Sequence, residues 1–233
     1  MSRNFWVIVP AAGSARRMGG AVPKQYLPLA GRTVIEWSLA PFLAHACTAG
    51  IVIALAEQDP RWSRMELARE AKIMTTSGGA ERMDSVLAGL EVLQAKAAPD
   101  DWVLVHDAAR PCLSATDLDR LLEELNDDAV GGLLAAPVVD TLKRADENGR
   151  VAQTVAREKL WRALTPQMFR RDILQRALAE ARARGVAVTD EAQAVEALGL
   201  QPKLVAGDAD NIKITLPEDL ARAERILRSR SPA

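Results

Sequence analysis

A loop rich in small residues and cations follows the first apolar run of the chain. The segment FWVIVPAAGSARRMGGAVPKQY begins at Phe5, and its loop carries Arg17 and Lys24. Small residues such as Gly13 let backbone N–H groups approach anionic oxygens, and the cations neutralise the charge on those oxygens. The spacing matches neither GxxxxGK[ST] nor GxGxxG, so neither a P-loop nor a dehydrogenase-type dinucleotide site is indicated. We expect a polyphosphate site here, the alternative being a solvated turn with surface cations.

Three further segments place charged or hydroxyl side chains on or directly after predicted strands. TSGGAERMDSV contains Gly79 and Ser85, whose backbone and hydroxyl could bind a base or a ribose. VHDAARP places Asp107 and Arg110 at a strand end, where a carboxylate could support a divalent cation, the alternative being an ion-paired loop. DNIKIT places Lys213 on what we expect to be another short strand. Parallel sheets bind ligands outside the carboxyl ends of their strands, so we expect these residues to share one site.

Short apolar runs alternate with helical patterns along the chain. The runs cover Trp6–Val9, Ile51–Ala56, Lys72–Thr75, Trp102–Val105 and Leu133–Val138. Such alternation indicates βαβ units, and we therefore expect a doubly wound α/β fold with a mostly parallel sheet. One helix is predicted to begin at Thr33, because Glu36 follows three residues later and completes the pattern of a capping box. The length of 233 residues suits a single domain over residues 1–233.

Residues 138–157 do not fit a compact sheet. Two polar, strand-like runs flank Asn148 and Gly149, the dipeptide most typical of a tight hairpin turn. An isolated two-stranded ribbon is marginally stable in water, and its open edges favour pairing with another chain. We expect a protruding β-hairpin arm used for homodimerisation, the alternative being a monomeric surface flap.

Composition narrows the class of protein. Hydrophobic residues make up 48% and charged residues 26% of the chain, as in soluble globular proteins. The net charge of -1 argues against nucleic acid as a partner. No apolar run is long enough to span a bilayer and no signal peptide precedes the first strand, so we expect a cytoplasmic protein without a membrane partner. The two cysteines and two histidines lack zinc-ligand spacing, and we interpret His106 as a positional or structural residue, the alternative being a catalytic base.

These segments together resemble a known family. PAAGSARRMGG, PKQYLPL, GGAERMDSV, VHDAARP, DTLKR, ALTPQMF, TDEA, and NIKIT followed by PEDL occur in order across nearly the whole chain. The set is similar to that of the 2-C-methyl-D-erythritol 4-phosphate cytidylyltransferases, which use CTP in the non-mevalonate isoprenoid pathway. Ala15 departs from the pattern, because many relatives carry a glycine there, and it makes the loop less permissive of positive φ.

The resemblance implies a Rossmann-like nucleotidyltransferase fold, a homodimer that exchanges the arm, and transfer of a cytidylyl group from CTP to methylerythritol phosphate with release of pyrophosphate. The catalytic residues that it implies are Arg17, Lys24, Arg157 and Lys213. The nucleotide-binding residues are Ala11, Ala12, Gly13, Gly79 and Ser85. The acceptor-binding residues are Arg110, Thr141, Arg157, Thr165 and Thr189. The implied cofactor is a divalent cation, expected to be Mg²⁺, at Asp107.

Two alternative functions remain open at this point. A cytidylyltransferase acting on ribitol 5-phosphate would share the CTP half of the site, and one sequence does not discriminate finely between the two acceptors. A nucleotide-binding regulator would keep the phosphate loop without turnover. The chain retains every charge-stabilising position of the motif set, which weighs against the regulator because binding alone would not require all of them.

Overall fold

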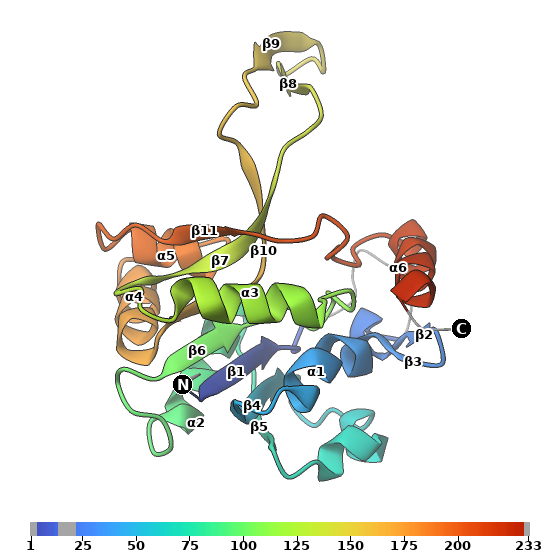
Figure 1. Cartoon of the computed structure of the whole chain (residues 1–233), viewed down its shortest axis with the longest axis vertical. Helices are drawn as coiled ribbons and strands as arrows, with labels where there is room; N and C mark the ends of the chain where they lie inside the picture. Colours follow the sequence, from blue (N-terminus) through green and yellow to red (C-terminus); the bar gives the residue numbers. More distant parts are fainter. Residues whose placement is uncertain (1–3, 14–21, 231–233) are drawn as a thin grey trace.

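The computed structural model describes residues 4–13 and 22–230, and its main strands form one central sheet (Figure 1). Seven strands lie in the order β11-β7-β10-β6-β1-β4-β5. They are β1 (Phe5–Pro10), β4 (Thr48–Leu55), β5 (Ile73–Ser77), β6 (Trp102–Val105), β7 (Gly131–Pro137), β10 (Trp161–Arg170) and β11 (Lys203–Ala206). Every adjacent pair is parallel except the two that involve β10, which runs antiparallel to β6 and β7. The predicted α/β fold with a mostly parallel sheet is confirmed.

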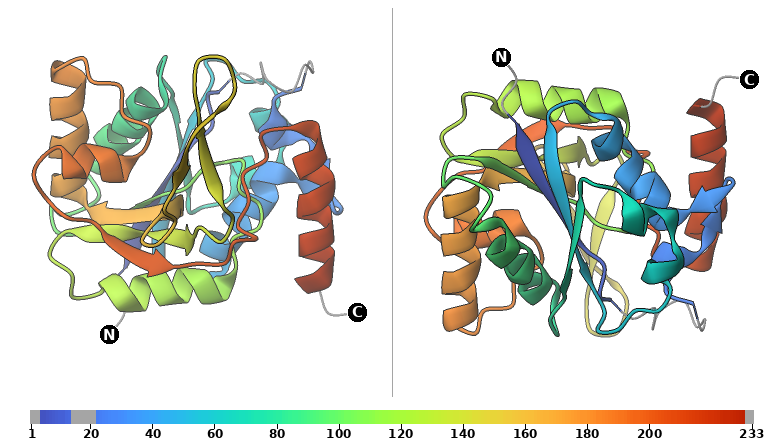
Figure 2. Two further views of the ribbon diagram at one scale, coloured as in Figure 1. Left: turned by 90° about the horizontal axis from the view of Figure 1, so that it is seen from above. Right: turned by 90° about the horizontal axis from the view of Figure 1, so that it is seen from below.

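Helices cover both faces of this sheet (Figure 2). They are α1 (Val34–Ala44), α2 (Arg82–Leu93), α3 (Ala115–Leu125), α4 (Arg171–Ala183), α5 (Glu191–Glu196) and α6 (Pro217–Arg230). The shorter elements are η2 (Lys24–Tyr26), β2 (Pro28–Leu29), β3 (Arg32–Thr33), η3 (Trp62–Arg64) and η4 (Glu66–Arg69). Over the part of the chain that the structure describes, no helix is long and apolar enough to cross a membrane.

The central strands are apolar on both faces because helices pack on each side. In β1, Val7 and Val9 join the buried cluster formed with α1 and α3, whereas Ile8 joins the cluster formed with α2, α4 and α5. Successive side chains of a strand point to opposite faces, so a doubly covered strand needs an unbroken apolar run. Helix α6 belongs instead to a third cluster, which includes Leu29 of β2 and Ile214.

The predicted capping box at the start of α1 is present. The Glu36 N–H donates to Thr33 Oγ1 at 3.4 Å, and the Thr33 N–H donates to the Glu36 carboxylate at 2.6 Å. These reciprocal bonds satisfy N–H groups that the first turn of a helix leaves without helical partners. Helix α1 therefore begins directly after β3 and packs beside η2, the element that carries Lys24.

The strand prediction is incomplete at the end of the sheet near the arm. Strands β10 and β11 lie in segments for which no strand was predicted. Conversely, the prediction of a strand that carries Lys213 is wrong, because residues 211–215, all of them described, adopt no strand. The Ile214 N–H donates to Ala109 O at 2.8 Å, while the Ile212 N–H donates locally to Asp210 O at 2.7 Å. One bond to the loop after β6 is too little for a ladder, which needs pairing along several residues.

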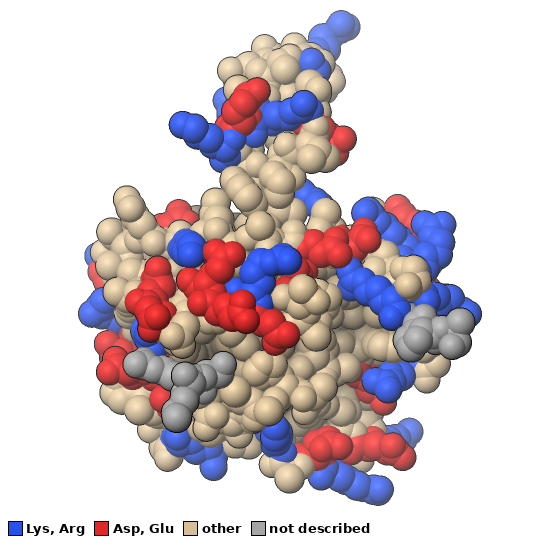
Figure 3. Space-filling model, viewed as in Figure 1, with Lys and Arg blue, Asp and Glu red and all other residues tan. Residues whose placement is uncertain are grey.

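A hairpin projects from the body between β7 and β10 (Figure 1). Strands β8 (Leu142–Ala145) and β9 (Val151–Val155) pair antiparallel with each other in a separate two-stranded sheet. Gly149 in the connecting turn has φ +74°, a conformation that glycine adopts without steric penalty. Figure 3 shows Lys and Arg side chains, together with acidic ones, on the surface of the arm. Whether residues 138–157 pair with a second copy stays a prediction.

Candidate active site

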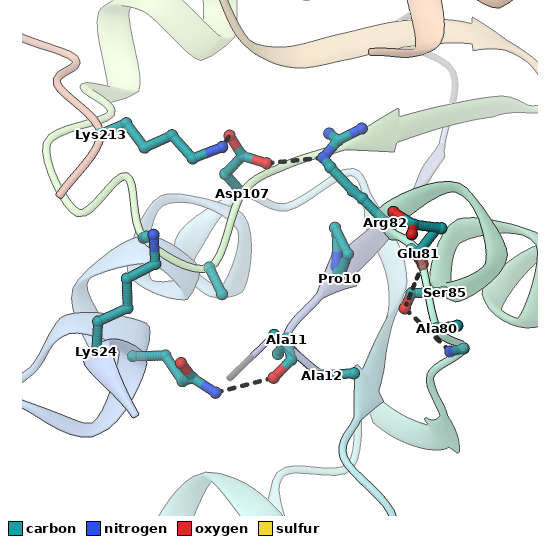
Figure 4. Close-up of a pocket in the computed structure, with 15 residues that line it drawn as sticks. Pro10, Ala11, Ala12, Lys24, Ala80, Glu81, Arg82, Ser85, Asp107 and Lys213 are labelled. Atoms are coloured by element: carbon teal, nitrogen blue, oxygen red, sulfur yellow. Dashed lines mark hydrogen bonds and ion pairs between the residues drawn. The ribbon is translucent and has the colours of Figure 1, made fainter. Parts of the chain in front are cut away.

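A cavity of about 290 Å³ opens where the carboxyl ends of β1, β5 and β6 meet (Figure 4). It is lined by the segments that follow these strands, together with Lys24, Gln25 and Lys213. Strand β1 is parallel to both of its neighbours, β4 and β6. The loops that follow parallel strands converge at one edge of the sheet. The predicted nucleotide-binding residues Ala11, Ala12, Gly13, Gly79 and Ser85 all line this cavity.

The glycine turn after β5 lies against the loop after β1. A Cβ atom at Gly78 would come within 2.4 Å of the Ala12 Cβ and 2.8 Å of Ser85 Oγ, so only glycine fits there. The Gly79 N–H donates to Ser85 Oγ at 3.2 Å, and the Ser85 hydroxyl donates to Glu81 O at 3.3 Å. These contacts fix the wall of the cavity at the start of α2.

The predicted catalytic cations of the first loop divide between described and undescribed residues. Arg17 falls within 14–21, outside the described residues, as does Ala15. Lys24 lines the cavity, and its Nζ donates to Ile214 O at 2.9 Å. That bond joins the loop after β1 to the segment that carries Lys213. Two lysines far apart in sequence therefore reach the same cavity from different segments.

Asp107 collects three cations at the floor of the site. Its Oδ2 lies 2.9 Å from Lys213 Nζ and 3.4 Å from Arg110 Nε, and its Oδ1 lies 3.1 Å from Arg82 Nε. Burial alone would raise the pKa of Asp107, but the charges of Arg82, Lys213 and Arg110 outweigh it and hold the pKa well below its usual range. The carboxylate is therefore ionised and keeps the three cations close together.

The donor set at Asp107 fits a divalent cation in one arrangement. No group of three or more His, Cys, Asp or Glu side chains among the described residues could hold a metal ion. Mg²⁺, however, is commonly held by one or two carboxylates together with substrate phosphates. Asp107 can supply the single carboxylate, because the ion would balance the carboxylate charge that Arg82, Arg110 and Lys213 now balance, and the three cations would be left to pair with phosphate oxygens.

A second cavity of about 130 Å³ adjoins the first. The predicted acceptor residues Arg110, Thr165 and Thr189 line it. Thr141 and Arg157, by contrast, are described residues of the arm region that line neither cavity. Both are exposed, and the Arg157 guanidinium donates to the backbone oxygen of Val139. The structure thus brings three of the five predicted acceptor residues together within one chain.

A bulge in β10 brings Thr165 to the second cavity. The pairing with β7 passes from Ala163 opposite Ala135 to Gln167 opposite Leu133, so β10 holds two extra residues at this point. Bulges of this kind redirect side chains near functional sites. Pro166 is tolerated inside the strand because a bulged residue donates no ladder hydrogen bond.

Thr165 is held by a buried network that also contains His106. The Asp107 N–H donates to Thr165 Oγ1 at 3.1 Å, and Thr165 Oγ1 lies 2.9 Å from His106 Nδ1. His106 Nε2 lies 3.1 Å from the backbone oxygen of Arg110, which can only accept, so Nε2 carries the proton and the Thr165 hydroxyl donates to Nδ1. Burial lowers the pKa of His106 to about 4. A neutral, fully buried imidazole supports its interpretation as a structural residue.

Two charged residues of this region were not predicted from the sequence. Arg82, the first residue of α2, contacts Asp107 and forms two hydrogen bonds to Glu191, the first residue of α5. The sequence did offer one signal for Arg82, because it follows the Gly78 and Gly79 turn after a strand. It offered none for Glu191, whose burial and partner become visible once the helices are placed.

Comparison with known proteins gives a consistent result along the chain. The family model described as 2-C-methyl-D-erythritol 4-phosphate cytidylyltransferase matches residues 5–229. The protein of that name from Pseudomonas aeruginosa (strain UCBPP-PA14) is 58% identical over 222 residues, which are 95% of each chain. The one from Pseudomonas putida (strain GB-1) is 57% identical over 217 residues, covering 93% of this chain and 92% of the relative.

Solved structures agree with the sequence relatives. A crystal structure of 4-diphosphocytidyl-2C-methyl-D-erythritol synthase superposes with a TM-score of 0.84 at 39% identity, covering 97% of this chain and 99% of the other. The 2-C-methyl-D-erythritol 4-phosphate cytidylyltransferase from Thermus thermophilus superposes with a TM-score of 0.80 at 36% identity, with the same coverage. The likeness of fold therefore extends over nearly the whole length of this chain.

Proposed function

This chain belongs to the 2-C-methyl-D-erythritol 4-phosphate cytidylyltransferase family, and we propose that its two adjoining cavities bind the two substrates of that family's reaction. The protein is a nucleotidyltransferase that transfers a cytidylyl group from CTP to 2-C-methyl-D-erythritol 4-phosphate. The products are 4-diphosphocytidyl-2-C-methyl-D-erythritol and pyrophosphate. One observation carries the division of the site: Arg82, Asp107 and Lys213 line both cavities, so ligands of the two cavities meet there.

The chemistry requires positioning and charge stabilisation. A phosphate oxygen of the acceptor attacks the α-phosphorus of CTP and forms a new P–O bond. The bond from that phosphorus to the bridging oxygen breaks, and its electron pair leaves with pyrophosphate. A phosphate monoester has a second pKa near roughly 6 and is already largely ionised at neutral pH, so the attack needs no general base. His106 is buried and neutral, which is consistent with a reaction that uses no general base.

Cations around the cavities supply the stabilisation. In the first cavity we assign Lys24 to the triphosphate, where negative charge grows as pyrophosphate leaves, and we assign Arg17, which lies outside the described residues, to the same charge from the family resemblance. Lys213 and Arg110 lie within reach of the second cavity and are assigned to the acceptor phosphate. The hydroxyl of Thr189, at the wall of the same cavity, is assigned to the sugar alcohol.

We assign the divalent cation of this reaction to Mg²⁺, with Asp107 as its protein ligand. When bound with the nucleotide, the ion neutralises phosphate charge and polarises phosphate oxygens. The Asp107 carboxylate also holds Arg82, Arg110 and Lys213 close together, where their charges can neutralise phosphate. The protein thus keeps its cations arranged around a single carboxylate.

The acceptor cavity is proposed to be completed by a second copy of the chain. Thr141 and Arg157 are exposed in the arm region and line neither described cavity of their own chain. The side chains of Val139 and Val151 are also exposed there, at 72% and 65%. Apolar side chains exposed in this way do not stabilise an isolated arm. In a homodimer that exchanges arms, Arg157 of one subunit would reach the acceptor bound by the other.

The protein is proposed to work in the cytoplasm on small phosphorylated substrates, with no nucleic acid or membrane as partner. Cys47 and Cys112 are both free thiols, as proteins of a reducing compartment usually have.

The test is Mg²⁺-dependent release of pyrophosphate from CTP, with methylerythritol phosphate and ribitol 5-phosphate offered in parallel. Turnover with methylerythritol phosphate and little with the ribitol compound is expected. A preference for ribitol 5-phosphate would move the acceptor assignment to that substrate. Silence with both acceptors in a protein that binds CTP would show a nucleotide-binding regulator instead.

A further inference from the structure

Three side chains line both cavities, and one of them has no role in the reaction as described so far. They are Arg82, Asp107 and Lys213. The reaction joins two phosphate groups, so the new bond forms where the cavities meet. Asp107 is an anion, which leaves Arg82 and Lys213 as the cations of this shared wall among the described residues. Figure 4 shows the two side chains approaching Asp107 from opposite sides.

Arg82 is held in place by a carboxylate that lines neither cavity. The Glu191 side chain is 1% exposed and accepts hydrogen bonds from Arg82 Nη1 at 2.5 Å and from Nη2 at 3.0 Å. Burial raises the pKa of the Glu191 carboxyl, and the charge of Arg82 opposes that rise. A bidentate contact fixes the plane of a guanidinium as well as its position. Glu191 therefore sets the direction in which Arg82 faces the cavities.

Arg82, which lines both cavities, also keeps hydrogen-bonding capacity. A guanidinium has five N–H groups, and three take part in the contacts with Asp107 and Glu191. The side chain is 27% exposed, although both of its carboxylate partners are buried. The remaining N–H groups are on the terminal nitrogens, which suit the oxygens of a phosphate group.

We infer that Arg82 binds the reacting phosphate groups at the junction of the cavities and that Glu191 is the residue that positions it. The inference rests on the proposed function, since it assigns Arg82 to the α-phosphate of the nucleotide and the phosphate of the acceptor. A fixed cation at this point stabilises the charge that develops on the transferring group more than it stabilises bound CTP. Its effect therefore falls on turnover rather than on nucleotide affinity.

The experiment compares Arg82→Gln, Glu191→Gln and the double variant with the wild type. Turnover is measured at saturating CTP and methylerythritol phosphate, and the Kd of CTP is measured by calorimetry. The double variant leaves no unpaired buried charge and keeps the test decisive where a single variant folds poorly. Arg182→Gln is the matched control, because Arg182 pairs at 3.7 Å with Asp84 of the same helix α2 but lines neither cavity.

We expect Arg82→Gln and the double variant to lower kcat by about 10²-fold while the Kd of CTP changes by less than about 3-fold. Glu191→Gln should lower kcat by about 10-fold and add nothing to Arg82→Gln, because it acts through Arg82. A folded double variant with kcat lowered by less than about 10-fold would overturn the inference, as would a loss confined to CTP binding. An inactive wild type would instead overturn the proposed function.

Discussion

The walls of the two cavities and the arm are built in opposite ways. Around the cavities, buried carboxylates such as Asp107 and Glu191 hold cations in fixed positions through several contacts each. In the arm, β8 and β9 pair with each other alone, and the predicted functional residues Thr141 and Arg157 are exposed. Preorganised charge is what transfer chemistry needs, whereas exposed polar side chains are suited to meeting another surface. Under the proposed dimer, one chain provides the CTP half of the site and the arm serves its partner.

The largest expected effect comes from removing a cation on the CTP side. Lys24→Ala should lower kcat by about 10²-fold or more, because the charge of the departing pyrophosphate loses a stabilising group. Arg17→Ala should act in the same direction for the same reason. Lys96→Ala, at an exposed lysine just after α2, is the control. If Lys24→Ala kept near wild-type kcat at saturating substrates, Lys24 would not belong to the transfer site.

The arm can be tested by mixing two inactive variants. Lys213→Ala damages the cavity of its own chain, and Arg157→Ala damages the arm. If arms act across the interface, a mixed dimer has one intact site, and an equal mixture should recover about a quarter of wild-type activity. If Arg157 serves its own chain, both sites of the mixed dimer stay damaged and the mixture remains inactive. Activity after co-refolding, with the oligomeric state from light scattering, decides between them.

The buried network beside the cavities should make stability depend on pH. Burial lowers the pKa of His106 from 6.5 to about 4, so between these values the unfolded chain takes up a proton that the native chain does not. This contribution to stability is therefore present at neutral pH and lost as pH falls, by about 3 kcal/mol in total. Denaturant unfolding at pH 7 and pH 4.5 measures the change. A His106→Gln variant should show a shallower pH dependence, and an equal slope would contradict the assignment.

The smallest expected effect lies in the arm. Lys143→Ala removes an exposed side chain whose Nζ donates to Thr154 Oγ1 at 2.7 Å. Surface substitutions of this kind change the free energy of unfolding by less than about 0.5 kcal/mol, and the melting temperature of the dilute protein should hardly move. A destabilisation of about 2 kcal/mol would mean that the arm belongs to the folded core and would remove the contrast between the two regions.

Much of the fold was predictable because apolar runs mark buried parallel strands directly. Five strands of the sheet were found in this way, whereas β10 was not. Its sequence includes Pro166, and its place between β6 and β7 depends on pairing between segments distant in the chain. The segment around Lys213 was predicted to be a strand, yet the Ile212 N–H donates locally to Asp210 O and the Ile214 N–H donates to Ala109 O in the loop after β6. The local sequence pattern shows which side chains are apolar. It does not show which backbone groups form hydrogen bonds with distant segments.

The site was predictable to the extent that loops after strands converge. Lys24, Asp107 and Lys213 were selected on that basis, and the structure brings them to one cavity. Arg82 was missed although it follows the glycine turn after a strand, and Glu191 was missed because its segment shows no sign of a buried ion pair with the start of another helix. Its existence depends on how α2 and α5 are packed, which is a property of the assembled chain.

The bulge in β10 adds two residues that the strand does not need for its pairing with β7. Two residues are one full period of a strand, so a chain without the extra pair would keep Ala163 and Gln167 on their present faces. The ladder to β7 could then run unbroken, and the sheet would lose nothing in pairing. What would be lost is the hydroxyl of Thr165 against His106 and Asp107. The irregular stretch of β10 thus gives up regular pairing with β7 at the point where Thr165 lines the second cavity.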